Sequence, residues 1–136
     1  KKIVISGWKR EIEELRKELI AANKRGIENT IFSFTSIDEQ LGKIVSYELD
    51  EEDLRKIWTP KVIMVVDNQH TIMGSTKKTE DCKAILTKNT AINEIATNHI
   101  ILDITLAGRR LDFDSDPYVK NIMRDPAENL QHLLKV

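Results

Sequence analysis

Asp67 is followed, after six residues, by Gly74 and Ser75, a spacing that also occurs in one half of a phosphodiesterase active site. The segment reads VIMVVDNQHTIMGS over residues 62–75. Five apolar residues end at Asp67, a polar turn follows, and a short apolar rise leads to the Gly-Ser pair. This pattern predicts a buried strand, a tight turn and a return strand. Catalysis at such a site would depend on the residues that precede Asp67.

Those preceding residues lack the groups that hydrolysis needs. Enzymes of the phospholipase D superfamily use His-x-Lys-x4-Asp-x6-Gly-Ser, in which the histidine is the nucleophile and the lysine holds phosphate charge. Counting back from Asp67 places Val62 at the lysine position and Pro60 at the histidine position. Lys61 is adjacent, but a shift of one residue along a strand turns a side chain to the opposite face. Such enzymes also need two motif copies or a dimer, and this chain has one partial copy. We therefore expect no catalytic residues, with Asp67 fixing the turn or lining a pocket.

No other cluster predicts a metal or cofactor site. Cys82 follows two acidic residues, which disfavour a reactive thiolate, so we interpret it as a small buried residue. Acidic residues alternate over 112–116, but the glycine and terminal glutamate of a calcium loop are missing, which favours a turn before Pro117. The histidines have no metal-ligand spacing; they are His70, His99 and His132. We expect neither a metal ion nor a cofactor.

Polar residues at the ends of the predicted strands are the remaining candidates for a binding site. In open α/β sheets, ligands bind at the carboxyl ends of the strands. Hydroxyls, an amide and a tryptophan suit a neutral polyol such as a sugar, although strand ends often carry such residues and a tryptophan is also suited to the core. The residues predicted in this way to bind a ligand are Ser6, Trp8, Ser33, Thr35, Ser75, Thr87 and Asn89, and Asp67 is added from the motif above.

The first elements form a βαβ unit. Residues 2–6 predict a buried strand, and apolar residues spaced by three or four from Trp8 to Ala22 predict an amphipathic helix over 8–24. Gly26 follows where a helix C-terminal glycine belongs, and residues 27–34 predict the next strand. A strand, a helix and a strand in this order imply parallel strands joined by a right-handed crossover.

The later segments predict further strands and helices. We expect strands at 44–49 and 83–87, a loop at 76–82, and a helix that Asn89 or Thr90 caps and that ends near Leu106, before Gly108. Short helices, broken at Pro126, are expected after residue 118. The apolar positions of the capped helix are Ile92, Ile95, Ala96, Ile100 and Leu102 or Ile104. The sum predicts one α/β domain over 1–136, with a mostly parallel sheet, flanking helices and short C-terminal helices.

Composition restricts the class of function. The net charge of −1 argues against a nucleic-acid surface over much of the chain. A single cysteine cannot form an internal disulfide, which favours a reducing, cytoplasmic setting, and no apolar run approaches the length of a membrane span. Because the sequence begins on a strand without an initiator methionine, we expect it to be a fragment of a longer protein.

The order of several short motifs resembles one family. ANKRGI at 22–27 is similar to Ala-x-x-Arg-Gly-Val, and VVD at 65–67 with Gly-Ser at 74–75 is similar to Val-Val-Asp-Gly near Gly-Ser. LTKNT at 86–90 is similar to a Trp-Thr-Arg-Asn-Pro segment that begins the last helix. Over residues 2–106 the chain thus resembles the C-terminal effector-binding domain of TrmB-like transcriptional regulators, which has a phospholipase-D-like fold. The departures are Asn68, Leu86, Lys88 and Thr90.

The resemblance implies a non-catalytic sensor. A small molecule such as a sugar would bind here and shift a homodimer between two arrangements, which would change how a preceding winged helix domain binds DNA. The family's sugar-contact residues are not carried over, because the extra β-rich region of its larger members is not matched. The dimer contact is expected on the tail helices or on the back of helix 8–24. A purely structural dimerisation domain and an active phospholipase-D-like nuclease are the alternatives.

Overall fold

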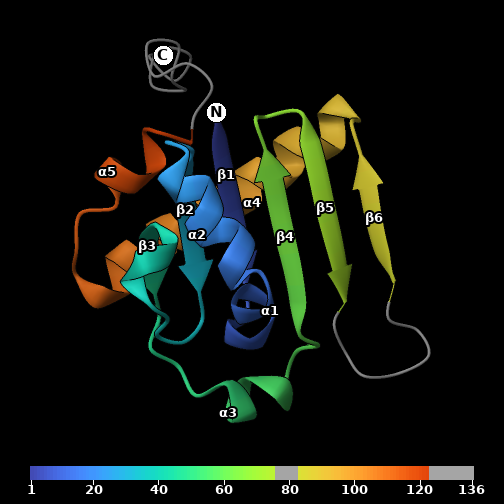
Figure 1. Ribbon diagram of the computed structural model, residues 1–136. Coiled ribbons are helices and arrows are strands. Elements are labelled where there is room, and N and C mark those ends of the chain that lie inside the picture. The colour runs from blue at the N-terminus through green and yellow to red at the C-terminus, as the bar shows by residue number, and fades with distance from the viewer. Residues whose placement is uncertain (76–82, 123–136) are drawn as a thin grey trace, which may run out of the picture.

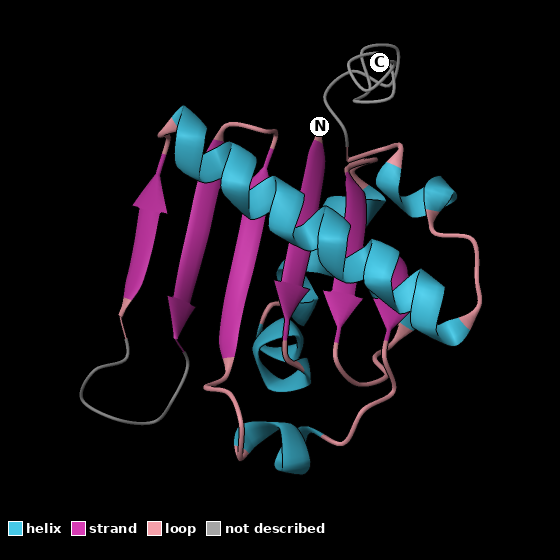
Figure 2. Cartoon of the chain, turned by 180° about the vertical axis from the view of Figure 1, so that it is seen from behind, coloured by secondary structure: helices cyan, strands magenta, loops and turns pink. Residues whose placement is uncertain are grey.

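One six-stranded sheet organises the molecule, and helices cover both of its faces (Figures 1 and 2). The computed structural model describes residues 1–75 and 83–122. The elements in chain order are β1 (Lys2–Gly7), α1 (Lys9–Glu14), α2 (Arg16–Lys24), β2 (Glu28–Ser33), the 3-10 turn η1 (Glu39–Leu41), β3 (Lys43–Ser46), α3 (Glu51–Arg55), β4 (Lys61–Val66), β5 (His70–Ser75), β6 (Ala84–Thr87), α4 (Thr90–Leu111) and α5 (Asp116–Val119). The predicted α/β class with flanking helices is confirmed.

The sheet is mixed, so the prediction of a mostly parallel sheet is wrong. The strand order is β3-β2-β1-β4-β5-β6. β1 pairs in parallel with β2, as the predicted βαβ unit requires, and β2 also pairs in parallel with β3. The pairs β1–β4, β4–β5 and β5–β6 are antiparallel. The Asp67-Asn68 turn, whose residues have φ of 52° and 55°, is too short for a crossover and makes the β4–β5 pair antiparallel.

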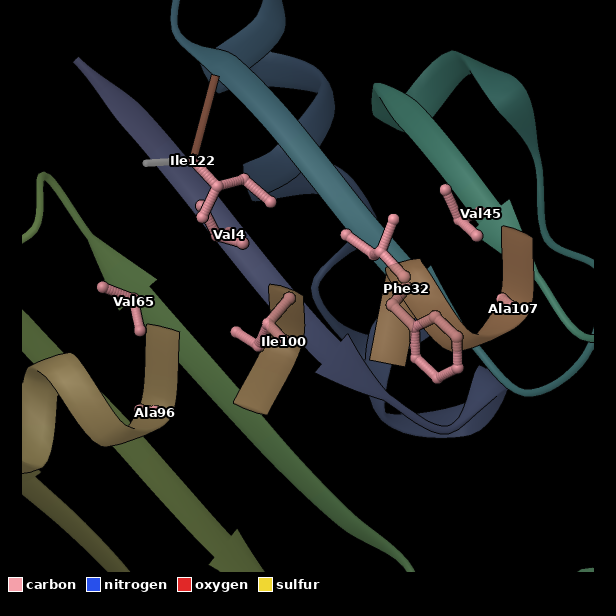
Figure 3. Close-up of a cluster of buried hydrophobic side chains, with 9 residues drawn as sticks. Val4, Phe32, Val45, Val65, Ala96, Ile100, Ala107 and Ile122 are labelled. Carbon is pink, nitrogen blue, oxygen red and sulfur yellow. The ribbon is translucent and has the colours of Figure 1, made fainter. Parts of the chain in front are cut away.

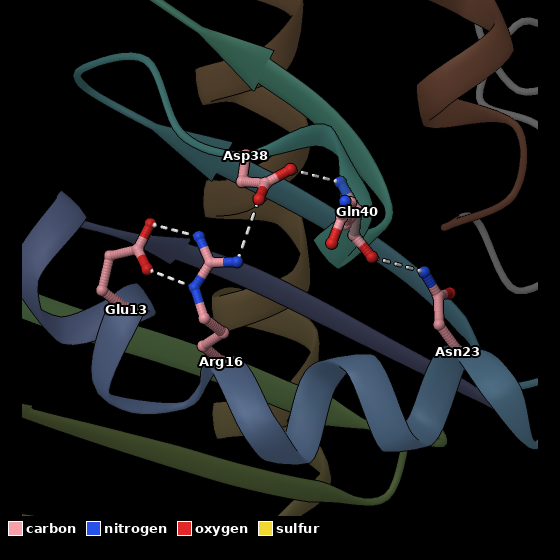
Figure 4. Close-up of polar contacts among 5 residues, drawn as sticks. All are labelled: Glu13, Arg16, Asn23, Asp38 and Gln40. Atoms are coloured by element: carbon pink, nitrogen blue, oxygen red, sulfur yellow. Dashed lines mark hydrogen bonds and ion pairs between the residues drawn. The ribbon is translucent and has the colours of Figure 1, made fainter.

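The helix predicted over residues 8–24 is two helices. α1 ends and α2 begins at Leu15, whose φ of −93° and ψ of 5° depart from helical geometry. Arg16 ties this junction to the loop before η1, because its guanidinium lies 2.7 Å from a Glu13 oxygen and 2.9 Å from an Asp38 oxygen (Figure 4). The break leaves the predicted apolar positions Ile12 and Leu19 buried against one sheet face.

Two cores lie on opposite faces of the sheet. Under α4, Val4, Phe32 and Val65 from three strands meet Ile100 and Ile104 (Figure 3). On the other face, α1, α2 and η1 cover alternate residues of the same strands; the members are Ile5, Ile12, Leu19, Ile31 and Leu41. The alternation along β1 and β2 explains how one sheet serves both layers.

α4 runs diagonally across the sheet from β5 to β3 (Figure 2). Its buried positions follow a step of three or four residues; they are Asn93, Ala96, Ile100, Ile104 and Ala107. Two predicted apolar positions of this helix, Ile95 and Leu102, instead face outward. The helix also continues past Gly108 to Leu111. Gly108 lies against the backbone of Phe113 and the side chain of Ser115, where a Cβ would be too close.

The remaining strand predictions match to within a few residues. The strands expected at 44–49 and 83–87 are observed as β3 and β6, and α5 is the one short helix that the described residues contain after residue 112. The predictions for Cys82 and its loop, for His132 and for a second tail helix lie outside the described residues. Within the described ranges, no helix is long and apolar enough to cross a membrane.

Candidate functional site

The mixed sheet divides the eight predicted site residues between two edges. β1, β2, β3 and β5 end, and β4 begins, at what we call the carboxyl edge; β4 and β6 end at the opposite, amino edge. The residues at or near the carboxyl edge are Ser6, Trp8, Ser33, Thr35 and Ser75. The residues at the amino edge are Asp67, Thr87 and Asn89. The eight residues therefore do not form one site.

At the amino edge, Asp67 fixes a turn. Its Oδ1 accepts a hydrogen bond of 2.8 Å from the backbone N–H of Lys2, and its own N–H donates to the Lys2 carbonyl at 2.9 Å. The Asp67 side chain thus ties the β4–β5 turn to the start of β1. This is one of the two roles that the sequence predicts for it; the other, a place in a sensing pocket, stays a prediction. Asp67 also borders a hollow of about 600 Å³.

Several polar side chains that line this hollow already form hydrogen bonds or ion pairs with protein groups. Lys2 Nζ donates to the Asn121 carbonyl at 2.7 Å, and Asn121 Nδ2 donates to Glu28 Oε1 at 2.8 Å. The same Glu28 oxygen lies 2.8 Å from Lys43 Nζ. A ligand that used these side chains would have to displace their contacts, so we consider the hollow beside Asp67 a weak candidate for a binding site.

Asn89 and Thr87 shape the start of α4. Asn89 is the N-cap residue, and its Oδ1 accepts from the Ile92 N–H at 3.1 Å. Thr87 Oγ1 accepts from the Asn89 N–H at 3.0 Å. The predicted cap is confirmed, and the polar groups of both side chains are engaged with the backbone of their own segment.

Two candidates at the carboxyl edge serve the fold. Ser33 is fully buried and its Oγ donates to the Thr35 carbonyl at 2.6 Å, which shapes the chain as it leaves β2. Trp8 is 1% exposed, and its ring meets that of Phe34 edge-on at 5.8 Å. Trp8 is therefore a core residue, the second of the two roles considered for it.

Ser6 leads to a polar cluster that the sequence analysis missed. Its Oγ donates to Asp103 Oδ2 at 2.9 Å, and His99 Nε2 lies 3.3 Å from the same oxygen. His99 and Asp103 stand one turn apart on α4, and α4 crosses β1 where Ser6 lies on the α4 face. Lys61 at the start of β4 adds a favourable charge. The available signal was the His-Asp spacing of four on a predicted helix.

The electrostatics of this cluster centre on Asp103. Burial raises the pKa of its carboxyl, while the charge of His99, the hydrogen bond from Ser6 and the charge of Lys61 lower it and offset part of that effect. The Asp103 side chain is 22% exposed and that of His99 is 49% exposed. The His99 imidazole is half exposed, and burial disfavours the charged form of the Asp103 carboxyl beside it. Both side chains could therefore exchange their present contacts for hydrogen bonds with a polar ligand.

The arrangement does not activate a nucleophile. In a Ser-His-Asp relay the imidazole stands between the hydroxyl and the carboxylate. Here Ser6 and His99 both contact the same oxygen of Asp103, so the imidazole does not receive the serine proton. The phosphodiesterase positions are also unsuited, because Val62 packs into the α1–α2 core while Lys61 lies on the opposite face, as the one-residue shift predicts.

An apolar groove and an aromatic side chain adjoin the cluster. The groove holds about 350 Å³ between the start of β4 and the end of β5, and both Lys61 and Ser75 line it. Trp58 is 51% exposed, with Lys61 Nζ 5.9 Å from the ring centroid. Lys61 lines the groove, lies beside the ring and contributes its charge to the environment of Asp103, so we treat the three features as one candidate site at the carboxyl edge.

Comparison with known proteins adds no assignment. No protein-family model matches this chain, and no curated protein sequence matches it. Among residues 1–75 and 83–122, no three histidine, cysteine or acidic side chains converge as they would around a metal ion. The chemistry of the carboxyl edge is therefore the basis for a functional proposal.

Proposed function

We propose that this chain is the effector-sensing domain of a TrmB-like transcription regulator, with a phospholipase-D-like fold and no catalytic activity. It would act in the cytoplasm as a homodimer and would influence DNA through a winged helix domain in the full-length protein. The observation that carries the proposal is the shared oxygen of Asp103. Ser6 and His99 hold one carboxylate beside a groove, which favours binding of a polar molecule over bond cleavage.

The ligand class follows from the two kinds of surface that meet at Lys61. The groove offers apolar contact, and Trp58 offers an exposed ring face. The polar cluster offers a carboxylate, an imidazole and an ammonium group for hydrogen bonds. A sugar has hydroxyls at its rim and an apolar ring face, so sugars and sugar phosphates are the proposed effectors.

Thermal melting tests this function. A panel of sugars and sugar phosphates should contain a compound that raises the melting temperature in proportion to the logarithm of its concentration. Trp58→Ala and Lys61→Ala should abolish the rise, whereas Lys43→Ala at the far end of the sheet should keep it. Cleavage of a phosphodiester by the purified chain, lost in a variant of Asp67, would contradict the proposal.

A purely structural dimerisation role is the second candidate. The observation that favours it is the exposed apolar face of α4, which carries Ile95, Leu102 and Leu106. The two roles separate experimentally, because a dimerisation domain would show no ligand-dependent rise in melting temperature with any compound of the panel.

A further inference from the structure

The outward face of α4 carries a row of large apolar side chains. Ile95 is 70% exposed, Leu102 57% and Leu106 44%. In Figure 2 the helix lies in front of the sheet, and among residues 1–75 and 83–122 no other element covers it. We call these three residues the α4 stripe.

The three residues of the α4 stripe lie on one line of the helix. Their spacing of seven and then four residues returns to nearly the same angle at 3.6 residues per turn, and they span about 16 Å at 1.5 Å per residue. The opposite face of α4 is already buried on the sheet through Ala96, Ile100 and Ile104. Apolar residues on both faces of a helix indicate a second contact surface.

The charges at the ends of α4 point to the occupant. Glu94 lies near the amino end, and Arg109 and Arg110 lie in the last turn. We propose that a second copy of this chain packs its own α4 antiparallel on the stripe. Ile95 would then meet Leu106 of the second copy, and Glu94 would lie at the end where that copy carries Arg109. A parallel arrangement would instead bring like charges together, and the helix dipoles also favour the antiparallel one.

The exposed edge of the sheet is a poorer surface for self-association. β6 is flanked by Lys83 and Lys88. If two copies of β6 paired antiparallel about Ile85 and Leu86, Lys83 of one would face Lys88 of the other. Lysines at an edge strand oppose such pairing. The α4 stripe shares no residue with the groove at the start of β4, and self-association can be measured without an added ligand.

Sedimentation velocity of the whole chain, without any added ligand, tests the interface. From about 1 to 100 µM the wild type should shift from monomer toward dimer. Leu102→Asp should weaken association at least about tenfold. Leu86→Asp is the matched control, because Leu86 is 69% exposed but lies on β6, and it should associate as the wild type does. A wild type that stays monomeric, or a Leu102→Asp dimer of wild-type strength, would overturn the proposal.

Charge reversal tests the antiparallel orientation. Glu94→Arg and Arg109→Glu should each weaken the dimer, and the double variant should recover association. Melting temperatures of all variants, measured alongside, separate loss of the interface from loss of the fold. A double variant weaker than both single variants would contradict antiparallel pairing. Failure here leaves effector binding untouched, since melting with the sugar panel reads that function independently.

Discussion

Two aspartates hold their charges in opposite environments. Burial raises the pKa of Asp103. The pKa of the partly exposed Asp38 is lowered, first by the Gln40 N–H and then by Arg16. The folded state therefore binds a proton more readily than the unfolded chain at Asp103 and less readily at Asp38. The two residues should contribute to stability with opposite dependence on pH.

Asp103→Asn is expected to reduce the fall in the free energy of unfolding between mildly acidic and neutral pH. With a raised folded pKa, Asp103 contributes stability that is present below its unfolded pKa and lost as the pH rises through the folded value. The amide keeps an acceptor for Ser6 and carries no charge, so this loss should disappear. Urea unfolding from mildly acidic to neutral pH measures it.

Asp38→Asn is the counterpart of that experiment. Asp38 contributes stability that is present above its unfolded pKa and is lost as the pH falls through the lowered folded value. Relative to the wild type, Asp38→Asn should lose more stability at neutral pH than at acidic pH. This dependence is opposite to that of Asp103→Asn. Two variants that change the profile in the same direction would contradict the assignment of these environments.

Asn29 is a buried side chain on which the fold depends. It is 1% exposed, and its Nδ2 donates to the carbonyls of Leu19 at 2.9 Å and Leu41 at 3.0 Å. Asn29→Ala would leave both carbonyls without this donor and is expected to cost about 2–4 kcal/mol. Asn121→Ala removes an exposed contact and should stay within about 0.5 kcal/mol in chemical denaturation. Equal losses in the two variants would disprove this role for Asn29.

At the scale of elements, two glycines that end helical segments make different demands. Gly42 follows η1 with φ of 144°, and a Cβ there would lie 2.5 Å from the Asn29 carbonyl oxygen. Gly26 follows α2 with φ of 80° and has open space around it. Gly42→Ala should cost more than about 2 kcal/mol and Gly26→Ala about 1 kcal/mol. Thermal unfolding ranks them, and the reverse order would contradict the close packing at Gly42.

The start of α4 depends on one cap. Asn89→Ala removes the acceptor for the Ile92 N–H and is expected to cost about 1 kcal/mol in urea unfolding. Asn98→Ala, at an exposed position of the same helix, should have little effect or a small stabilising one, because alanine has the higher helix propensity. A cap variant as stable as the wild type would show that α4 is held by packing alone.

At the scale of the whole molecule, local patterns predicted the elements but not their arrangement. Alternation and apolar runs located β1, β2 and the β4–β5 hairpin, and Asn89 located the start of α4. The place of β4 beside β1 depends on pairing across the intervening helices and β2, which no local pattern encodes. The site was affected most. Ser6 and Ser75 were predicted as residues at strand ends, whereas His99 and Asp103 meet Ser6 only because α4 crosses the sheet.

Mapping a bound ligand onto the two sheet edges tests the central claim most directly. Backbone amide NMR spectra would be recorded while glucose, sucrose and glucose 6-phosphate are titrated separately into the chain. A sugar that binds should shift the signals of Ser6, Trp58, Lys61 and Asp103 together and leave those of Asp67 and Asn89 unchanged. Shifts confined to the amino edge would contradict the carboxyl-edge site.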